Sequence, residues 1–211
     1  MGKPSSFLTF LLIAGWIIAI GISGTALLRF AGTAGATGTA ATQWPVTSGL
    51  PQPRELPALV MFLHPHCPCS RASVANLARL AARLANRVRI TVVLVAPPGV
   101  NESWVHGSLH DAVQEVPTVT IRIDRNGREA RLFGALTSGQ TYFYTGGGDC
   151  AFAGGITPLR GHEGDNPGID AILSLALTGS SDTSTWPVTG CPLFDDAEAG
   201  TSVENGEVPV R

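Results

Sequence analysis

Charge is scarce in this sequence of 211 residues, and lysine occurs once, at Lys3. The net charge is −2, so the composition predicts neither a nucleic-acid-binding surface nor strong electrostatic steering of a partner. The sequence also lacks a glycine-rich phosphate loop, a Ser/His/Asp hydrolase pattern and an internal repeat. The side chains left to carry chemistry are four cysteines and five histidines.

The N-terminal region has an uncharged run from Ser5 to Leu28. We predict a transmembrane helix over residues 7–28, a length sufficient to span the hydrocarbon core of a bilayer. Basic residues flank both ends and weakly favour residues 1–6 on the cytoplasmic side. The expected location is therefore a bacterial inner membrane, with one pass and the domain facing the periplasm or exterior. A cleaved signal peptide is the alternative, although the apolar run is long for one.

Three further regions follow the apolar run. Residues 29–55 are rich in Gly, Ala, Thr and Pro, and they predict a flexible linker. Residues 56–194 are expected to form one folded domain with a C-terminal extension. Residues 195–211 form an acidic tail that we expect to be disordered.

The pattern within the domain alternates between strands and helices. A continuous apolar run predicts a buried strand over 58–63, and apolar residues at helical spacing follow it. The expected strands are 58–63, 88–95, 119–123, 141–144 and 150–153, with a turn over 124–127, and the expected helices are 68–86, 102–114 and 168–177. Asn166 and Pro167 are a good N-cap and first residue for the last helix. The fold class is α/β, with a central mixed sheet flanked by helices.

The segment with the most chemistry is His64-Pro65-His66-Cys67-Pro68-Cys69. It lies between the first predicted strand and the first predicted helix of the domain. A helix N-terminus stabilises a thiolate, because its unpaired N–H groups and the helix dipole favour negative charge. The segment is therefore either a reactive dithiol or a site for a soft metal.

This strand, cysteine segment and helix, with the later hairpin, resemble the thioredoxin-like superfamily over residues 56–179. The sequence looks closest to the membrane-anchored TlpA and peroxiredoxin-like branch, and residues 154–166 are similar to RedB-type proteins. The resemblance implies a thiol–disulfide oxidoreductase that acts on protein thiols or disulfides and needs no cofactor.

Two departures from the family pattern affect the site. The family has Cys-x-x-Cys, whereas this chain has Cys67-Pro68-Cys69, and side chains two apart on a helix do not face each other. A Cys67–Cys69 disulfide would be strained and easily reduced. The family also has a cis-proline opposite the dithiol. In the preferred register Ser138-Gly139-Gln140 takes its place, and in the competing register Val116-Pro117-Thr118 keeps the proline.

The redox hypothesis assigns a role to each side chain of the segment. Cys67 is expected to be the nucleophile, as the more exposed thiol at the helix end, and Cys69 the resolving thiol. His64 or His66 would lower the thiol pKa or move a proton, unless both are simply polar loop residues. Arg71 would add positive potential, unless it simply belongs to a solvated face of the helix.

A metal hypothesis uses the same segment. Cys67, Cys69 and His66, with the distant His162, would bind copper or zinc. This arrangement resembles the logic of Sco-type copper chaperones, which are also anchored thioredoxin-like domains. A redox-inert assembly module on the membrane is the third possibility.

The remaining candidates lie far along the chain. Cys191 either folds back towards Cys67 as a resolving or ligating thiol, or forms a disulfide with Cys150. Cys150 can also be a small apolar residue at a strand edge. Gly139 and His162 are expected to line the thiol site, although the loop around His162 can also serve only to cap the last helix.

Overall fold

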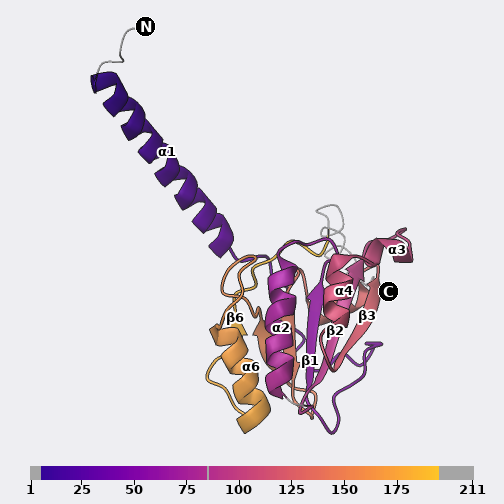
Figure 1. Ribbon diagram of the computed structural model, residues 1–211. Helices are drawn as coiled ribbons and strands as arrows, with labels where there is room; N and C mark the ends of the chain where they lie inside the picture. The colour runs from indigo at the N-terminus through magenta and orange to yellow at the C-terminus, as the bar shows by residue number, and fades with distance from the viewer. Residues whose placement is uncertain (1–5, 85, 195–211) are drawn as a thin grey trace, which may run out of the picture.

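The computed structural model describes residues 6–84 and 86–194 (Figure 1). One long helix extends away from an α/β domain that carries all the strands described. The helices are α1 (Ser6–Gly32), α2 (Ser70–Leu84), α3 (Glu102–Val105), α4 (Ser108–Gln114), α5 (Arg128–Phe133) and α6 (Pro167–Thr178). The strands are β1 (Ala58–Leu63), β2 (Arg89–Ala96), β3 (Val119–Arg125), β4 (Gln140–Tyr144), β5 (Cys150–Gly154) and β6 (Thr185–Trp186).

The sheet is mixed, as the sequence predicted, and its strand order is β3-β2-β1-β4-β5-β6. Strands β1, β2 and β3 run parallel, with Leu63 paired to Leu94 at the carboxyl end of β1. Strand β4 runs antiparallel to both β1 and β5, and the short β6 runs parallel to β5. All six residues of β1 are buried, because the strand is paired on both edges and covered on both faces.

The two faces of the sheet carry separate cores, because successive side chains of a strand point to opposite faces. Leu59, Met61 and Leu63 of β1 pack with residues of α2, α4 and α6. Figure 1 shows α2 and α4 in front of the parallel strands, with α6 beside α2. On the other face, Val60 and Phe62 pack with an aromatic group from α5 and β4.

The segment Gly35–Leu50 covers this second face, which differs from the flexible linker expected over residues 29–55. Trp44 is 7% exposed, and its ring meets Phe133 and Tyr144 edge-on at centroid distances of 5.1 and 5.2 Å. The Tyr144 hydroxyl donates to the carbonyl of Ala41 at 2.9 Å. The composition indicated flexibility, but the segment is ordered because it supplies the covering layer of an otherwise exposed aromatic core.

Two of the expected elements differ in the structure. The helix expected over 102–114 is two helices, because His106 at the end of α3 has an extended backbone and Gly107 precedes α4. Helix α5 was not predicted. It forms because the buried Asp124 accepts hydrogen bonds from the backbone N–H groups of Glu129 and Ala130, at 3.0 and 2.8 Å, and so satisfies the start of the helix.

The last helix follows the prediction closely. The Asn166 side chain accepts hydrogen bonds from the backbone N–H groups of Gly168 and Ile169, at 3.1 and 3.2 Å. Pro167 occupies the first turn, where its missing N–H costs nothing.

Helix α1 is apolar and exposed over most of its length, with a mean hydropathy of 2.2 over its most apolar stretch. By length and composition it can cross a membrane, and it extends slightly beyond the predicted span of 7–28 at both ends. Its last turn meets the domain, where the Arg160 N–H donates to the carbonyl of Ala31 at 2.9 Å. Residues 1–5 of the expected cytoplasmic end and the expected acidic tail, 195–211, lie outside the described residues.

Candidate functional site

The cysteine segment leaves the carboxyl end of β1 through two consecutive turns. The Cys67 N–H donates to the His64 carbonyl at 3.0 Å, and the Ser70 N–H donates to the Cys67 carbonyl at 3.2 Å. Helix α2 begins at Ser70, two residues later than expected, so Cys69 precedes the helix instead of lying within its first turn.

Three sulfur atoms meet at this point. The Cys67 and Cys191 sulfurs are 2.8 Å apart, and the Cys67, Cys69 and Cys191 sulfurs all lie within 4.8 Å of one another. All four cysteines are free thiols, and 2.8 Å is longer than a disulfide bond of about 2.05 Å. We call Cys67, Cys69 and Cys191 the three-sulfur cluster.

Cys191 reaches Cys67 because its segment pairs with the loop before β4. The Ser138 N–H donates to the Cys191 carbonyl at 2.8 Å, and the Leu193 N–H donates to the Leu136 carbonyl at 2.8 Å. Gly190 allows this approach, since a Cβ atom there would collide with the carbonyl oxygen of Ser138. The segment of Cys191 thus runs antiparallel to the loop before β4, with an isolated bridge between Thr137 and Pro192.

The exposure of the two cysteines differs from the expectation that Cys67 is the more exposed thiol. Cys67 is 3% exposed and Cys69 is half-buried, so Cys67 is not the more exposed thiol. Burial by itself raises the pKa of the Cys67 thiol, but hydrogen bonds with Cys191 and Ser70 outweigh it and hold that pKa below its usual value.

The two touching thiols have opposite pKa shifts. Burial, together with the hydrogen bond to Cys67 and the charge near it, raises the pKa of Cys191 to about 12, although Arg160 acts in the opposite direction. Cys67 is therefore the thiol that ionises first, and once it is a thiolate its sulfur accepts the hydrogen bond from the Cys191 thiol. This assignment gives the thiolate to the sulfur that has two hydrogen-bonding partners.

The pKa of Cys67 can be measured directly. The rate of Cys67 modification by iodoacetamide should reach half its plateau at a lower pH than for a free-cysteine peptide in the same assay, because the thiolate is the reacting form. Mapping by mass spectrometry separates Cys67 from Cys69. Cys191→Ala should move the midpoint upward, since the hydrogen-bond donor is lost. A midpoint above that of the free peptide in the unmodified chain would contradict the thiolate assignment.

Ser138 and Gly139 lie against the cysteine segment. The His64 N–H donates to the Ser138 hydroxyl at 2.8 Å, the Ser70 and Ser138 hydroxyls are 2.7 Å apart, and the Gly139 N–H donates to the Phe62 carbonyl at 2.8 Å. Gly139 has φ +96°, which favours glycine. The register that puts Ser138-Gly139 in the place of the family proline is therefore the one supported.

The competing register fails on topology. Pro117 precedes β3, whose first residue pairs with Ile90 at the beginning of β2. The thiols follow the opposite, carboxyl end of the parallel strands, so Pro117 lies at the wrong edge of the sheet.

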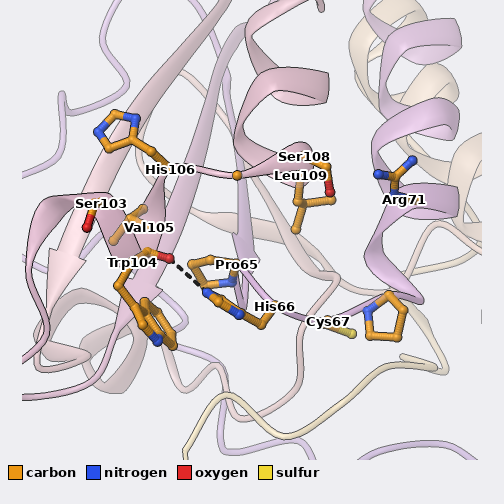
Figure 2. Close-up of a pocket in the computed structure, with 12 residues that line it drawn as sticks. Pro65, His66, Cys67, Arg71, Ser103, Trp104, Val105, His106, Ser108 and Leu109 are labelled. Carbon is orange, nitrogen blue, oxygen red and sulfur yellow. Dashed lines mark hydrogen bonds between the residues drawn. The ribbon is translucent and has the colours of Figure 1, made fainter.

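Both histidines of the segment face Trp104. The His66 ring stacks on the indole at a centroid distance of 4.3 Å, and its Nε2 is 2.8 Å from the Trp104 carbonyl oxygen (Figure 2). The His64 Nδ1 accepts from the His66 N–H at 3.2 Å. Neither ring is among the groups that shift the Cys67 pKa, so hydrogen bonds from Cys191 and Ser70 take the role expected of histidine.

Two other candidates lie apart from the three-sulfur cluster. The His162 ring is exposed and its Nδ1 is 2.9 Å from the Arg160 carbonyl oxygen. Cys150 pairs with Tyr144, which lies opposite Ala58 at the other end of the sheet. The expected alternative of a Cys150–Cys191 disulfide is therefore wrong: Cys191 is a free thiol beside Cys67.

A pocket of about 370 Å³ opens beside Cys67, between the beginning of α2 and the α3–α4 connection (Figure 2). Its walls include His66, Arg71, Trp104 and His106. The sequence contained no signal for this pocket, because residues 102–114 read as one continuous helix.

The expected metal-ligand set is only partly assembled. Cys67 and Cys69 are together, but Cys191 joins them in place of His66 and His162. Three converging thiols suit Cu(I) or Zn²⁺, which prefer sulfur ligands. The donor set therefore fits a soft metal, with sulfur donors only.

Comparison with known proteins gives the fold. No family model and no curated protein matches the chain. An uncharacterized conserved protein from Geobacillus kaustophilus matches with a TM-score of 0.54 and 18% identity, over 76% of this chain and 91% of that chain. A secreted Mycobacterium tuberculosis disulfide oxidoreductase homologous to Escherichia coli DsbE matches with a TM-score of 0.38 and 18% identity, over 46% and 68%. Copper-bound ScoI from Arabidopsis thaliana matches with a TM-score of 0.40 and 14% identity, over 66% and 94%.

The neighbours thus include disulfide oxidoreductases and copper-binding Sco proteins, and at these identities the likeness concerns the fold. The assignment to the TlpA and RedB-type branch stays a prediction. The chain therefore shares its fold with the Geobacillus kaustophilus protein, and the thioredoxin-like assignment stays a prediction from the sequence.

Proposed function

We propose that this protein is a thiol–disulfide oxidoreductase in which Cys67 is the nucleophile and Cys191 the resolving thiol. The observation that carries the proposal is the 2.8 Å contact between these two sulfurs, with the pKa of Cys67 lowered and that of Cys191 raised. The lowered pKa also argues against a redox-inert assembly module.

The reaction needs no group beyond the thiols and a substrate disulfide. The Cys67 thiolate attacks one sulfur of the substrate, the substrate disulfide breaks, and the leaving thiolate takes a proton from water. Cys67 is then held in a mixed disulfide. Cys191 then loses its proton to water and its sulfur attacks the Cys67 sulfur, which breaks the mixed disulfide. The second substrate sulfur leaves as a thiolate and takes up a proton, and a Cys67–Cys191 disulfide remains.

The order of these steps follows from the charges at the site. Two of the causes that raise the Cys191 pKa, its hydrogen bond to Cys67 and the charge near it, disappear once Cys67 is in a mixed disulfide. Arg160, which lowers that pKa, remains. Cys191 is therefore held as a thiol until Cys67 has reacted, and becomes easier to deprotonate afterwards.

Cys69 would be a third thiol within reach of both sulfurs. A bond from Cys67 to Cys191 does not require the distortion that a Cys67–Cys69 bond would need, because the two segments approach from separate parts of the fold. Helix α1 would anchor the protein in a bacterial inner membrane, with protein thiols or disulfides on the outer side as substrates.

Oxidation of the whole chain tests the proposal. The chain should be purified in detergent, with and without reductant, and analysed for metal, free thiols and disulfide position. We expect metal-free protein that cycles between four free thiols and a state with one disulfide, mapped to Cys67 and Cys191. A disulfide mapped to Cys67 and Cys69 would contradict the assignment of the resolving thiol, and four unreactive thiols would contradict the function.

A second candidate function is soft-metal binding, favoured by the three-sulfur cluster itself. Copper or zinc would be held by Cys67, Cys69 and Cys191. The same purification decides between the two functions: near-stoichiometric metal that blocks these thiols and is lost in Cys67→Ser would favour metal binding over exchange.

A further inference from the structure

The Cys67 sulfur can be approached from two directions, and the protein's own chain blocks one of them. On the side of Ser138, the segment Gly190–Leu193 pairs with the loop before β4 and brings Cys191 to the sulfur. A substrate strand cannot reach Cys67 along this edge while that segment is in place. The other side is the pocket between α2 and the α3–α4 connection, which Cys67 itself lines (Figure 2).

The size of the pocket indicates what can enter it. A volume of about 370 Å³ lies at the small end of the range for small-molecule sites, roughly 300–1,000 Å³. The flat indole of Trp104, with the His66 ring stacked on it, forms one wall. These dimensions favour a compact molecule over a protein segment.

The charge of the pocket indicates the sign of that molecule. Arg71, His66 and His106 line it, and its lining contains no acidic side chain. The nearest acidic side chains along α3 and α4 face other groups: Glu102 pairs with Arg125 at 3.0 Å, and Asp111 lies 3.4 Å from the His110 ring. Arg71 makes no ion pair with any residue that the structure describes, so its charge is available to a ligand.

We propose that this pocket binds a low-molecular-weight disulfide that carries carboxylate groups, and presents it to Cys67. This inference rests on the proposed function, for which it names the class of oxidising substrate. The small disulfide is reduced to two thiols as Cys67 and Cys191 are oxidised to a disulfide, by the two exchange steps given above. Arg71 binds a carboxylate, and Trp104 packs against the carbon chain.

Three disulfides of similar size test the inference: 3,3′-dithiodipropionate, which is anionic, 2-hydroxyethyl disulfide, which is neutral, and cystamine, which is cationic. The initial rate of thiol loss is measured on the reduced full-length chain in detergent. A thiolate alone repels the anionic reagent, so a faster reaction with the anion than with the cation supports the proposal. In Arg71→Gln the ratio of anionic to cationic rates should fall about 1.4- to fivefold, the range expected for one exposed charge pair.

The ratio isolates binding from reactivity, because any change in the Cys67 pKa affects all three reagents equally. Arg83→Gln is the matched control: it removes the same charge from the last turn of α2, outside the pocket, and should leave the ratio unchanged. A ratio that Arg71→Gln does not change would overturn the inference while leaving the proposed function intact. If Cys67 takes up iodoacetamide but reacts with none of the three disulfides, the proposed function itself fails.

Discussion

Replacing Cys191 by serine is expected to lengthen the lifetime of a mixed disulfide on Cys67 by about a hundredfold or more. The reason is proximity: the Cys191 sulfur lies 2.8 Å from Cys67, so its attack is intramolecular, and removing it leaves resolution to slower thiols. Cys69→Ser should lengthen the lifetime much less. The measurement is the decay of the adduct after one addition of a model disulfide, followed by intact mass.

Cys67→Ser provides the control for that experiment, because it should prevent formation of the adduct altogether. The assignment of roles would be wrong if Cys69→Ser trapped the adduct longer than Cys191→Ser. That result would return the resolving role to the neighbouring cysteine, as expected from the cysteine pattern alone.

Trp44→Ala is expected to lower the free energy of unfolding of the domain by about 3 kcal/mol, the lower end of the range for truncating a buried large aromatic side chain. Trp44 packs edge-on against Phe133 and Tyr144, and its removal would leave a cavity between them. The indole N–H has no hydrogen-bonding partner among the described residues, so the loss is one of packing. Denaturant unfolding of the full-length chain, followed by near-ultraviolet circular dichroism, measures the change.

Val46→Ala is the matched control for Trp44→Ala, since Val46 is two residues away and 86% exposed. It should change the free energy of unfolding by less than about 0.5 kcal/mol. Equal effects from the two substitutions would mean that the segment Gly35–Leu50 contributes no packing and is the flexible linker that its composition suggested.

The local sequence pattern was sufficient to predict several helices and strands. The continuous apolar run of β1 and the helical spacing within α2 each encode a face that must be buried, and the structure buries both. The boundaries of α6 followed from its own capping residues. By contrast, α5 begins through the side chain of Asp124 on the preceding strand, so the apolar pattern of 128–133 alone did not predict it.

The sequence also predicted part of the candidate site correctly and part of it wrongly. Sequence alone located Cys67 and Cys69 after the central strand, and it kept Cys191 open as a thiol that could fold back. It ranked exposure wrongly, because the segment of Cys191 that packs against Cys67 lies far from it in sequence.

The sequence by itself determined the α/β fold class, the thioredoxin-like resemblance, the long apolar helix at the N-terminus and the position of the reactive thiol. These features depend on short-range periodicity, composition and the order of neighbouring elements, all of which can be read along the chain. Only the tertiary structure decided which thiol meets Cys67, what covers the aromatic face and where a ligand can enter. Each of these depends on contacts between distant residues, such as the 124 positions that separate Cys67 from Cys191, and no local pattern encodes the partner in such a contact.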